Sequence, residues 1–87
     1  ENRSLIAISL IAGNYGMGAH DFNLLLHDLG VQHKCSGTWV LNKKYVEHNY
    51  TQTLCVGKPW TGWTREGVTF LYTLLKKNGI VPLRERK

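Results

Sequence analysis

The chain has 87 residues, of which 43% are hydrophobic and 20% charged, and its formal net charge is +5. This length allows one small domain with a modest core, which argues against a large enclosed active site. The composition is that of a folded chain rather than a disordered one. The positive charge suggests a nucleic acid or an acidic protein as a partner.

The charge is unevenly distributed along the chain. Residues 1–33 sum to −2, residues 34–58 to +3 and residues 59–87 to +4. Two cysteines are too few for a disulfide scaffold. No apolar stretch has the length of a membrane span, and no signal-peptide pattern is present. We therefore expect a single cytoplasmic domain over residues 1–87.

The first third of the chain predicts two short helices joined by a glycine-rich turn. Ser4 is a candidate N-cap for a helix over Leu5–Ile11, which is nearly all apolar and expected to be buried on most sides. The three glycines of Gly13–Gly18 are expected to end this helix. A second helix is expected over Ala19–Leu29, with Gly30 as its C-terminal cap. The positions expected to face the core from these helices and the hairpin that follows are Ile8, Ile11, Phe22, Leu25, Leu29 and Trp39.

The middle third changes to a strand-like period. Gln32–Cys35 and Thr38–Leu41 predict a β-hairpin around a Ser-Gly turn. A short helical turn is expected over Asn42–His48 and another strand over Tyr50–Val56. Gly57, Lys58 and Pro59 are expected to break this strand, which leaves Trp60 in a loop as a candidate exposed anchor. Trp63, like Trp39, is expected in the core.

The last third predicts the longest helix. Thr64 is a plausible N-cap, and the helix is expected to run to Asn78. Gly79 takes the C-terminal capping position, and Pro82 prevents continuation. Residues 83–87 are expected to fray. The predicted fold is therefore a small α+β, winged helix-turn-helix-like domain with a β-hairpin and a long C-terminal helix.

Three functional classes follow from these residues. A helix-turn-helix with a wing would bind DNA, and the candidate DNA-binding residues are His20, Asn23, Lys34, Lys43 and Lys44. However, no Arg or Lys lies between Arg3 and Lys34, and Asp21 and Asp28 would face the phosphates. The second class is a protein-binding domain, favoured by the three Trp and four Tyr. The third is an assembly module with neither partner.

Chemistry beyond binding has little support in the sequence. The spacing of His33, Cys35, His48 and Cys55 matches no common zinc pattern. No phosphate-binding loop and no nucleophile motif are present. We therefore expect no enzymatic activity, no metal and no cofactor. Homo-oligomerisation, most simply as a dimer, is expected through one face of the C-terminal helix: Val68, Leu71, Tyr72 and Leu75.

Several blocks, in order, resemble the C-terminal domain of phage antirepressor proteins of the KilAC type. They include Ile11-Ala12, Tyr15-Gly16-Met17, Leu29-Gly30-Val31-Gln32, Trp39-Val40-Leu41, Tyr50-Thr51-Gln52-Thr53, Trp63-Thr64, Phe70-Leu71-Tyr72, Leu74-Leu75-Lys76-Lys77, Gly79-Ile80 and Pro82. The resemblance covers nearly the whole chain, about residues 4–82. It implies a phage or prophage regulator that acts in the bacterial cytoplasm and counters a phage repressor.

The resemblance and the residues together favour one function. We expect an antirepressor that binds a phage repressor protein and inactivates or disassembles its DNA-bound form, which promotes prophage induction. The candidate repressor-binding residues are Leu24, His27, Tyr50, Trp60 and Arg65. The alternative is a winged helix-turn-helix DNA-binding transcriptional regulator.

Overall fold

The computed structural model describes residues 5–54 and 60–86, and the side chains of Leu54 and Trp60 lie outside this description. It confirms a mixed α+β fold. The helices and strands, with η for short 3-10 helices, are α1 (Ile8–Asn14), α2 (Ala19–Asp28), β1 (Gln32–Cys35), β2 (Thr38–Leu41), η1 (Lys43–His48), β3 (Thr51–Leu54), β4 (Trp60–Trp63), α3 (Arg65–Lys77) and η2 (Leu83–Glu85).

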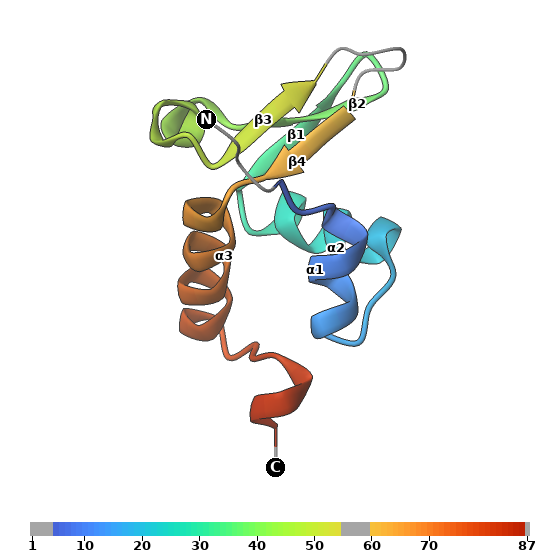
Figure 1. Cartoon of the computed structure of the whole chain (residues 1–87), viewed down its shortest axis with the longest axis vertical. Helices are drawn as coiled ribbons and strands as arrows, with labels where there is room; N and C mark the ends of the chain where they lie inside the picture. Colours follow the sequence, from blue (N-terminus) through green and yellow to red (C-terminus); the bar gives the residue numbers. More distant parts are fainter. Residues whose placement is uncertain (1–4, 55–59, 87) are drawn as a thin grey trace.

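The strands form two antiparallel hairpins, β1–β2 and β3–β4. Figure 1 shows both hairpins at one end of the molecule, with α1 and α2 below them on one side and α3 on the other. The chain ends at the opposite pole, beyond η2. A helix pair followed by a hairpin is the winged helix-turn-helix-like order that the sequence predicts.

The first helix differs from its prediction. It begins at Ile8 rather than Leu5, with Ala7 as its extended N-cap, and it continues through Gly13 to Asn14. Ile6 instead forms a β-bridge with Trp63, in which each backbone N–H donates to the other's carbonyl oxygen at 2.8–2.9 Å. This pairing along the edge of β4 overrides the local helical preference. The helix is also not buried on most sides, because Leu10 is 64% exposed.

The first hairpin has the predicted boundaries and turn. Its register pairs Gln32 with Leu41 at one end and Cys35 with Thr38 at the other. Both turn residues have positive φ, 52° at Ser36 and 81° at Gly37, which matches the twist of a two-residue hairpin loop. The short helical turn after it is also confirmed as η1, which ends at left-handed Asn49.

The second hairpin was not predicted. Thr51–Leu54 confirms part of the expected strand over Tyr50–Val56, whereas Val56 lies outside the described residues. The missed element is β4, which pairs with β3 in a register that places Thr51 opposite Trp63. Its residues contain a glycine and two tryptophans and lack the alternation by which a strand is recognised. Consequently Trp60 belongs to a strand, not to the loop expected from its neighbour Pro59.

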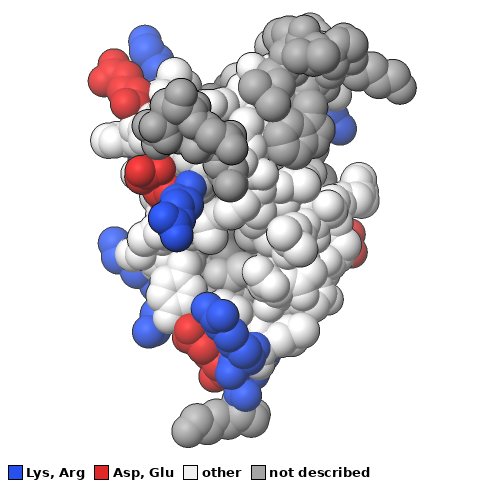
Figure 2. Space-filling model, viewed as in Figure 1, with Lys and Arg blue, Asp and Glu red and all other residues white. Residues whose placement is uncertain are grey.

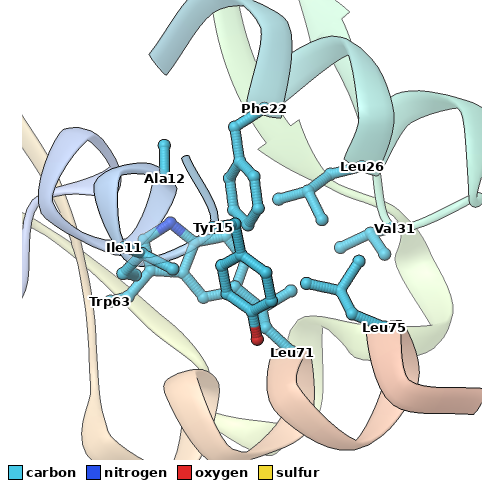
Figure 3. Packing of buried hydrophobic residues seen from close by; sticks show 9 residues of the cluster. All are labelled: Ile11, Ala12, Tyr15, Phe22, Leu26, Val31, Trp63, Leu71 and Leu75. Carbon is cyan, nitrogen blue, oxygen red and sulfur yellow. The ribbon is translucent and has the colours of Figure 1, made fainter. Parts of the chain in front are cut away.

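The core is formed where α1, α2, β4 and α3 meet. Its buried members are Ile11, Ala12, Tyr15, Phe22, Leu26, Val31, Trp63, Leu71 and Leu75 (Figure 3). Tyr15 and Phe22 stack within it, with ring centroids 5.4 Å apart. Burying one such large side chain contributes about 1.5–3 kcal/mol.

The residues predicted to lie in the core differ in how deeply they are buried. Ile11, Phe22 and Trp63 are buried as expected, and Ile8, Leu25 and Leu29 pack against the core while partly exposed. Trp39 was wrongly placed in the core. It stands opposite Lys34, one residue pair from the hairpin turn, and this end of the hairpin extends away from the core.

The C-terminal helix begins and ends as the sequence predicts. The Thr64 hydroxyl accepts a hydrogen bond from the Gly67 N–H at 3.0 Å and donates to the Asn49 carbonyl at 2.7 Å. At the other end Gly79 has a φ of 80°, and the Ile80 N–H donates back to the Leu75 carbonyl. These bonds satisfy backbone groups that a helix end leaves open.

The segment expected to fray contains a short helix within its described residues. Leu83–Glu85 form η2, whose carboxylate at Glu85 accepts a hydrogen bond from the Tyr72 hydroxyl at 2.9 Å. The Arg86 guanidinium donates to the Tyr15 carbonyl at 3.3 Å and to the Val81 carbonyl at 3.0 Å. These contacts join the end of the chain to α1 and α3, and local sequence signals do not reveal them. Lys87 lies outside the described residues.

Candidate interaction surfaces

The solvent face of α2 is the part of a helix-turn-helix that would read DNA. The exposed side chains on this face are His20, Asp21, Leu24, His27 and Asp28. The face therefore carries two acidic residues and neither lysine nor arginine. Leu24 is 42% exposed. The Nδ1 atom of His27 lies 3.6 Å from the Asp28 carboxylate, an ion pair only when the imidazole is protonated. Because phosphate neutralisation dominates DNA affinity, this face is poorly suited to the DNA backbone.

Asn23, the candidate base-reading residue, is engaged inside the domain. The amide of buried Gln32 donates to the Asn23 side-chain oxygen at 2.8 Å and to its backbone carbonyl at 3.3 Å. A bidentate contact to adenine uses both the oxygen and the nitrogen of an asparagine amide. The contact with Gln32 therefore uses one of the two lone pairs of the oxygen that base reading would need and fixes the orientation of the amide.

Trp39 links the first hairpin to α2. Its ring centroid lies 6.0 Å from that of His27, and the Lys34 ammonium lies 4.9 Å from the indole centroid. The lysine is thus placed for a cation–π interaction with the indole. This arrangement keeps Lys34 on the hairpin surface near α2.

The candidate DNA-binding residues are spread over three elements. His20 and Asn23 lie on α2, Lys34 on β1, and Lys43 and Lys44 on η1. All three lysines are exposed. In Figure 2 the charged side chains gather around η1, along α3 and at η2, while the part of this face over α1 and α2 is almost free of charge. The structure therefore does not gather these residues into one basic stripe along α2.

A second surface is formed by aromatic rings from η1, from the residue before β3 and from α3. The rings of Tyr50 and Phe70 stack with centroids 4.3 Å apart and planes 7° apart. His48 stacks on Tyr50 at 5.3 Å, and Tyr45 contacts Phe70 at 4.8 Å. The ammonium group of Lys44 lies 5.2 Å from the Tyr45 ring centroid. These stacked rings form a patch that is partly exposed.

A shallow groove beside this stack brings Arg65 next to the aromatic residues. It is lined by Tyr50, Arg65, Glu66, Thr69, Phe70 and Thr73. We define the aromatic–basic surface as Tyr45, His48, Tyr50 and Phe70 together with Lys44 and Arg65. It combines large rings with cations, the residue types that anchor protein interfaces.

The structure brings together only some of the candidate repressor-binding residues. Tyr50 and Arg65 line the same groove, whereas Leu24 and His27 lie on α2. Trp60 is in β4, and its side chain is outside the described part of the structure. Sequence reasoning missed Tyr45, His48 and Phe70 as members of a surface. The close spacing of Tyr45, His48 and Tyr50 was the only local signal, and their contact with Phe70 is a tertiary one.

The predicted self-association face is largely internal. Leu71 and Leu75 are fully buried in the chain's own core, because α3 turns its apolar stripe towards α1 and α2. They are therefore not available to a second copy. Val68 and Tyr72 are half-buried and line a cleft of about 590 Å³ between α1, α3 and the C-terminal turn.

This cleft contains one perturbed titratable group. Burial, followed by the proximity of Tyr72 and Glu85, raises the pKa of the Tyr15 phenol above its ordinary value of 10.0. In the described residues, no group of three or more His, Cys, Asp or Glu side chains lies close enough to hold a metal ion. Of the helices in the described ranges, none is long and apolar enough to cross a membrane.

The fold defines a small α+β domain of winged helix-turn-helix-like architecture with two candidate binding surfaces. The family model of the phage antirepressor protein KilAC domain matches residues 1–78, and the chain belongs to this family. Membership makes it an antirepressor-family protein of phage type and suggests a repressor or DNA as its partner. Comparison with curated proteins and with solved structures found no match.

Proposed function

We propose that this chain is an antirepressor that binds a phage repressor protein and inactivates or disassembles the repressor's DNA-bound form. Its action would promote prophage induction in the cytoplasm of the bacterial host, by binding alone and without a catalytic step. Family membership supports the antirepressor class. The observation that carries the choice of a protein partner is the acidic solvent face of α2, where a DNA reader would need cations.

A DNA-binding transcriptional regulator is the second candidate function. The exposed lysines Lys34, Lys43 and Lys44 and the net charge of +5 favour it. These residues would contact phosphates from the hairpin and η1 rather than from α2. Such binding would depend weakly on sequence, because phosphate contacts carry no base information.

One experiment separates the two functions. The purified chain is mixed with the repressor encoded nearest to its gene and run on a sizing column, and is separately titrated into operator DNA in a mobility-shift assay. The proposal predicts a joint peak with the repressor and no shift of operator DNA by the chain alone. Two peaks that never merge, together with a salt-sensitive DNA shift, would support the regulator instead.

Self-association remains part of the proposal, with a revised interface. Because Leu71 and Leu75 are buried, a homodimer would have to use exposed or half-exposed residues, among them Val68 and Tyr72. Light scattering over a range of concentrations measures the mass directly. A mass that stays at 9.9 kDa up to high micromolar concentration would refute the dimer.

A further inference from the structure

The aromatic–basic surface lies at the edge of the core, against which Tyr50 and Phe70 pack. Three of its rings form a continuous stack, since Tyr50 lies between His48 at 5.3 Å and Phe70 at 4.3 Å. His48, at the end of this stack, is exposed, and Tyr50 and Phe70 are half-buried. A stack fixed in the free protein binds with little further loss of side-chain freedom, which favours its use as a docking platform.

The charges around the stack sum to a small positive value. The exposed charged side chains on η1 and in the first turn of α3 are Lys43, Lys44 and Arg65 against Glu47 and Glu66. The solvent face of α2 has the opposite sign, with Asp21 and Asp28. A net-acidic partner is therefore steered towards η1 and α3 rather than towards α2.

We propose that the aromatic–basic surface is where the chain docks its repressor, through a net-acidic segment that carries an aromatic or large apolar side chain. This inference rests on the proposed function and specifies its interface. The shallow groove beside Tyr50 and Phe70 receives the apolar side chain. Carboxylates of the same segment pair with Arg65, which lines the groove, and with Lys44, which lies beside Tyr45.

The geometry favours a protein segment over single-stranded nucleic acid. In proteins that bind single-stranded nucleic acid, the bases stack on exposed aromatic faces along a basic groove. Here the facing sides of Tyr50 and Phe70 are stacked on each other with planes 7° apart, so a base cannot insert between them. Glu66 also lines the groove and Glu47 lies on η1, so a strand with a phosphate at every nucleotide would meet their negative charge, whereas a peptide segment can place its few carboxylates at Lys44 and Arg65 and neutral residues beside the glutamates.

A pair of matched charge reversals tests the proposal. The test variant is Lys44→Glu with Arg65→Glu, and the control variant is Lys34→Glu with Arg84→Glu. All four side chains are exposed, and both variants exchange one lysine and one arginine, so the total charge changes equally. Circular dichroism confirms that each variant is folded. Binding of the whole chain to the repressor encoded nearest to its gene is then measured by surface plasmon resonance at two salt concentrations.

The expected result is a loss of affinity of about 10-fold or more at low salt for the test variant, mainly through slower association, and less than about 3-fold for the control. The loss should shrink at high salt. A third variant, His48→Ala, removes the exposed end of the stack and should weaken binding several-fold at both salt concentrations.

Other outcomes overturn the inference in distinguishable ways. If the unaltered chain binds the repressor and the test variant binds equally well, the interface is wrong and the proposed function stands. If Leu24→Ala with His27→Ala abolishes binding and the test variant does not, the interface lies on α2. If the unaltered chain never binds the repressor, both proposals fail. If a single-stranded oligonucleotide binds through Lys44 and Arg65 while the repressor does not, the partner is nucleic acid.

Discussion

Gly67 lies where Tyr50, the residue before β3, meets the first turn of α3, and its replacement by alanine has two opposing effects on stability. In a helix, alanine is favoured over glycine by about 1 kcal/mol. However, a Cβ at this position would lie 2.9 Å from Cε3 of buried Trp63 and would overlap the backbone carbonyl oxygen of Tyr50. Backbone cannot rotate away as a flexible side chain can.

The overlap is expected to outweigh the helix preference. The Tyr50 carbonyl accepts a hydrogen bond from the Thr64 N–H at 2.9 Å, so moving the strand weakens the start of α3 as well. Overpacking in a well-packed region costs about 1–3 kcal/mol and occasionally more. We therefore expect Gly67→Ala to lower the free energy of unfolding by about 2–3 kcal/mol. For a domain of this size, that corresponds to a fall in Tm of about 10–20 °C.

Urea unfolding followed by tryptophan fluorescence measures this change. Gly13→Ala is the matched control, because Gly13 also lies in a helix and a Cβ there would meet nothing within 4 Å. The control is expected to leave stability unchanged or to raise it by up to about 1 kcal/mol. If Gly67→Ala were as stable as Gly13→Ala, the close approach of β3 to α3 would be refuted. Such a result would also weaken the placement of Tyr50 against Phe70.

Three further predictions concern the cap of α3, the buried phenol and the C-terminal turn. Thr64→Ala should lower the free energy of unfolding by about 1–2 kcal/mol, because the Thr64 hydroxyl accepts the hydrogen bond of the Gly67 N–H. Thr64→Ser keeps a hydroxyl and should not lower it. Equal urea midpoints for the Thr64→Ala and Thr64→Ser variants would contradict this prediction. The pKa of Tyr15 is higher in the folded chain than in the unfolded chain. The unaltered protein should therefore lose more stability than Tyr15→Phe as pH rises above about 10. Urea unfolding from about pH 8 to 11 measures this difference, and parallel stability curves for the two proteins would refute the prediction. Tyr72→Phe removes the hydrogen bond to Glu85. Amide hydrogen exchange of residues 83–86 should then accelerate, while the free energy of unfolding falls by less than about 1 kcal/mol. Unchanged exchange in these residues would show that this hydrogen bond does not stabilise η2.

Local chemistry explains which parts of the fold the sequence predicted well. The Ser36-Gly37 turn and the caps at Thr64 and Gly79 depend on residues within a few positions of one another. Their backbone preferences therefore appear directly in the sequence. Such signals predict the α+β fold class, the first hairpin, η1 and the C-terminal helix. The family resemblance is confirmed over residues 1–78.

The errors arise where distant segments meet. Ile6 pairs with Trp63, which delays the start of α1 and helps to form a β4 that has no strand-like alternation of its own. Arg86 contacts Tyr15 across 71 positions, beside a short helix that local sequence signals do not reveal. A sequence period cannot show such contacts, because each depends on the completed fold.

The candidate site was only partly predictable for the same reason. Tyr50 and Arg65 are predicted as members of one repressor-binding surface with Leu24 and His27. The fold places Tyr50 and Arg65 beside one groove and the other two residues on α2. Phe70 was not selected, because its spacing on α3 marks it only as one more apolar residue. The face chosen for self-association contained Leu71 and Leu75, since helical periodicity identifies an apolar stripe but does not reveal what covers it.

Release of the repressor from DNA tests the central claim most directly. Fluorescence anisotropy of labelled operator DNA is recorded with the repressor encoded nearest to this chain's gene, and the chain is then titrated in. The account predicts that the anisotropy falls to that of free operator, and that the chain has no effect on operator DNA without the repressor. An anisotropy that stays high throughout, or that rises when the chain meets operator DNA alone, would contradict an antirepressor that acts by binding the repressor.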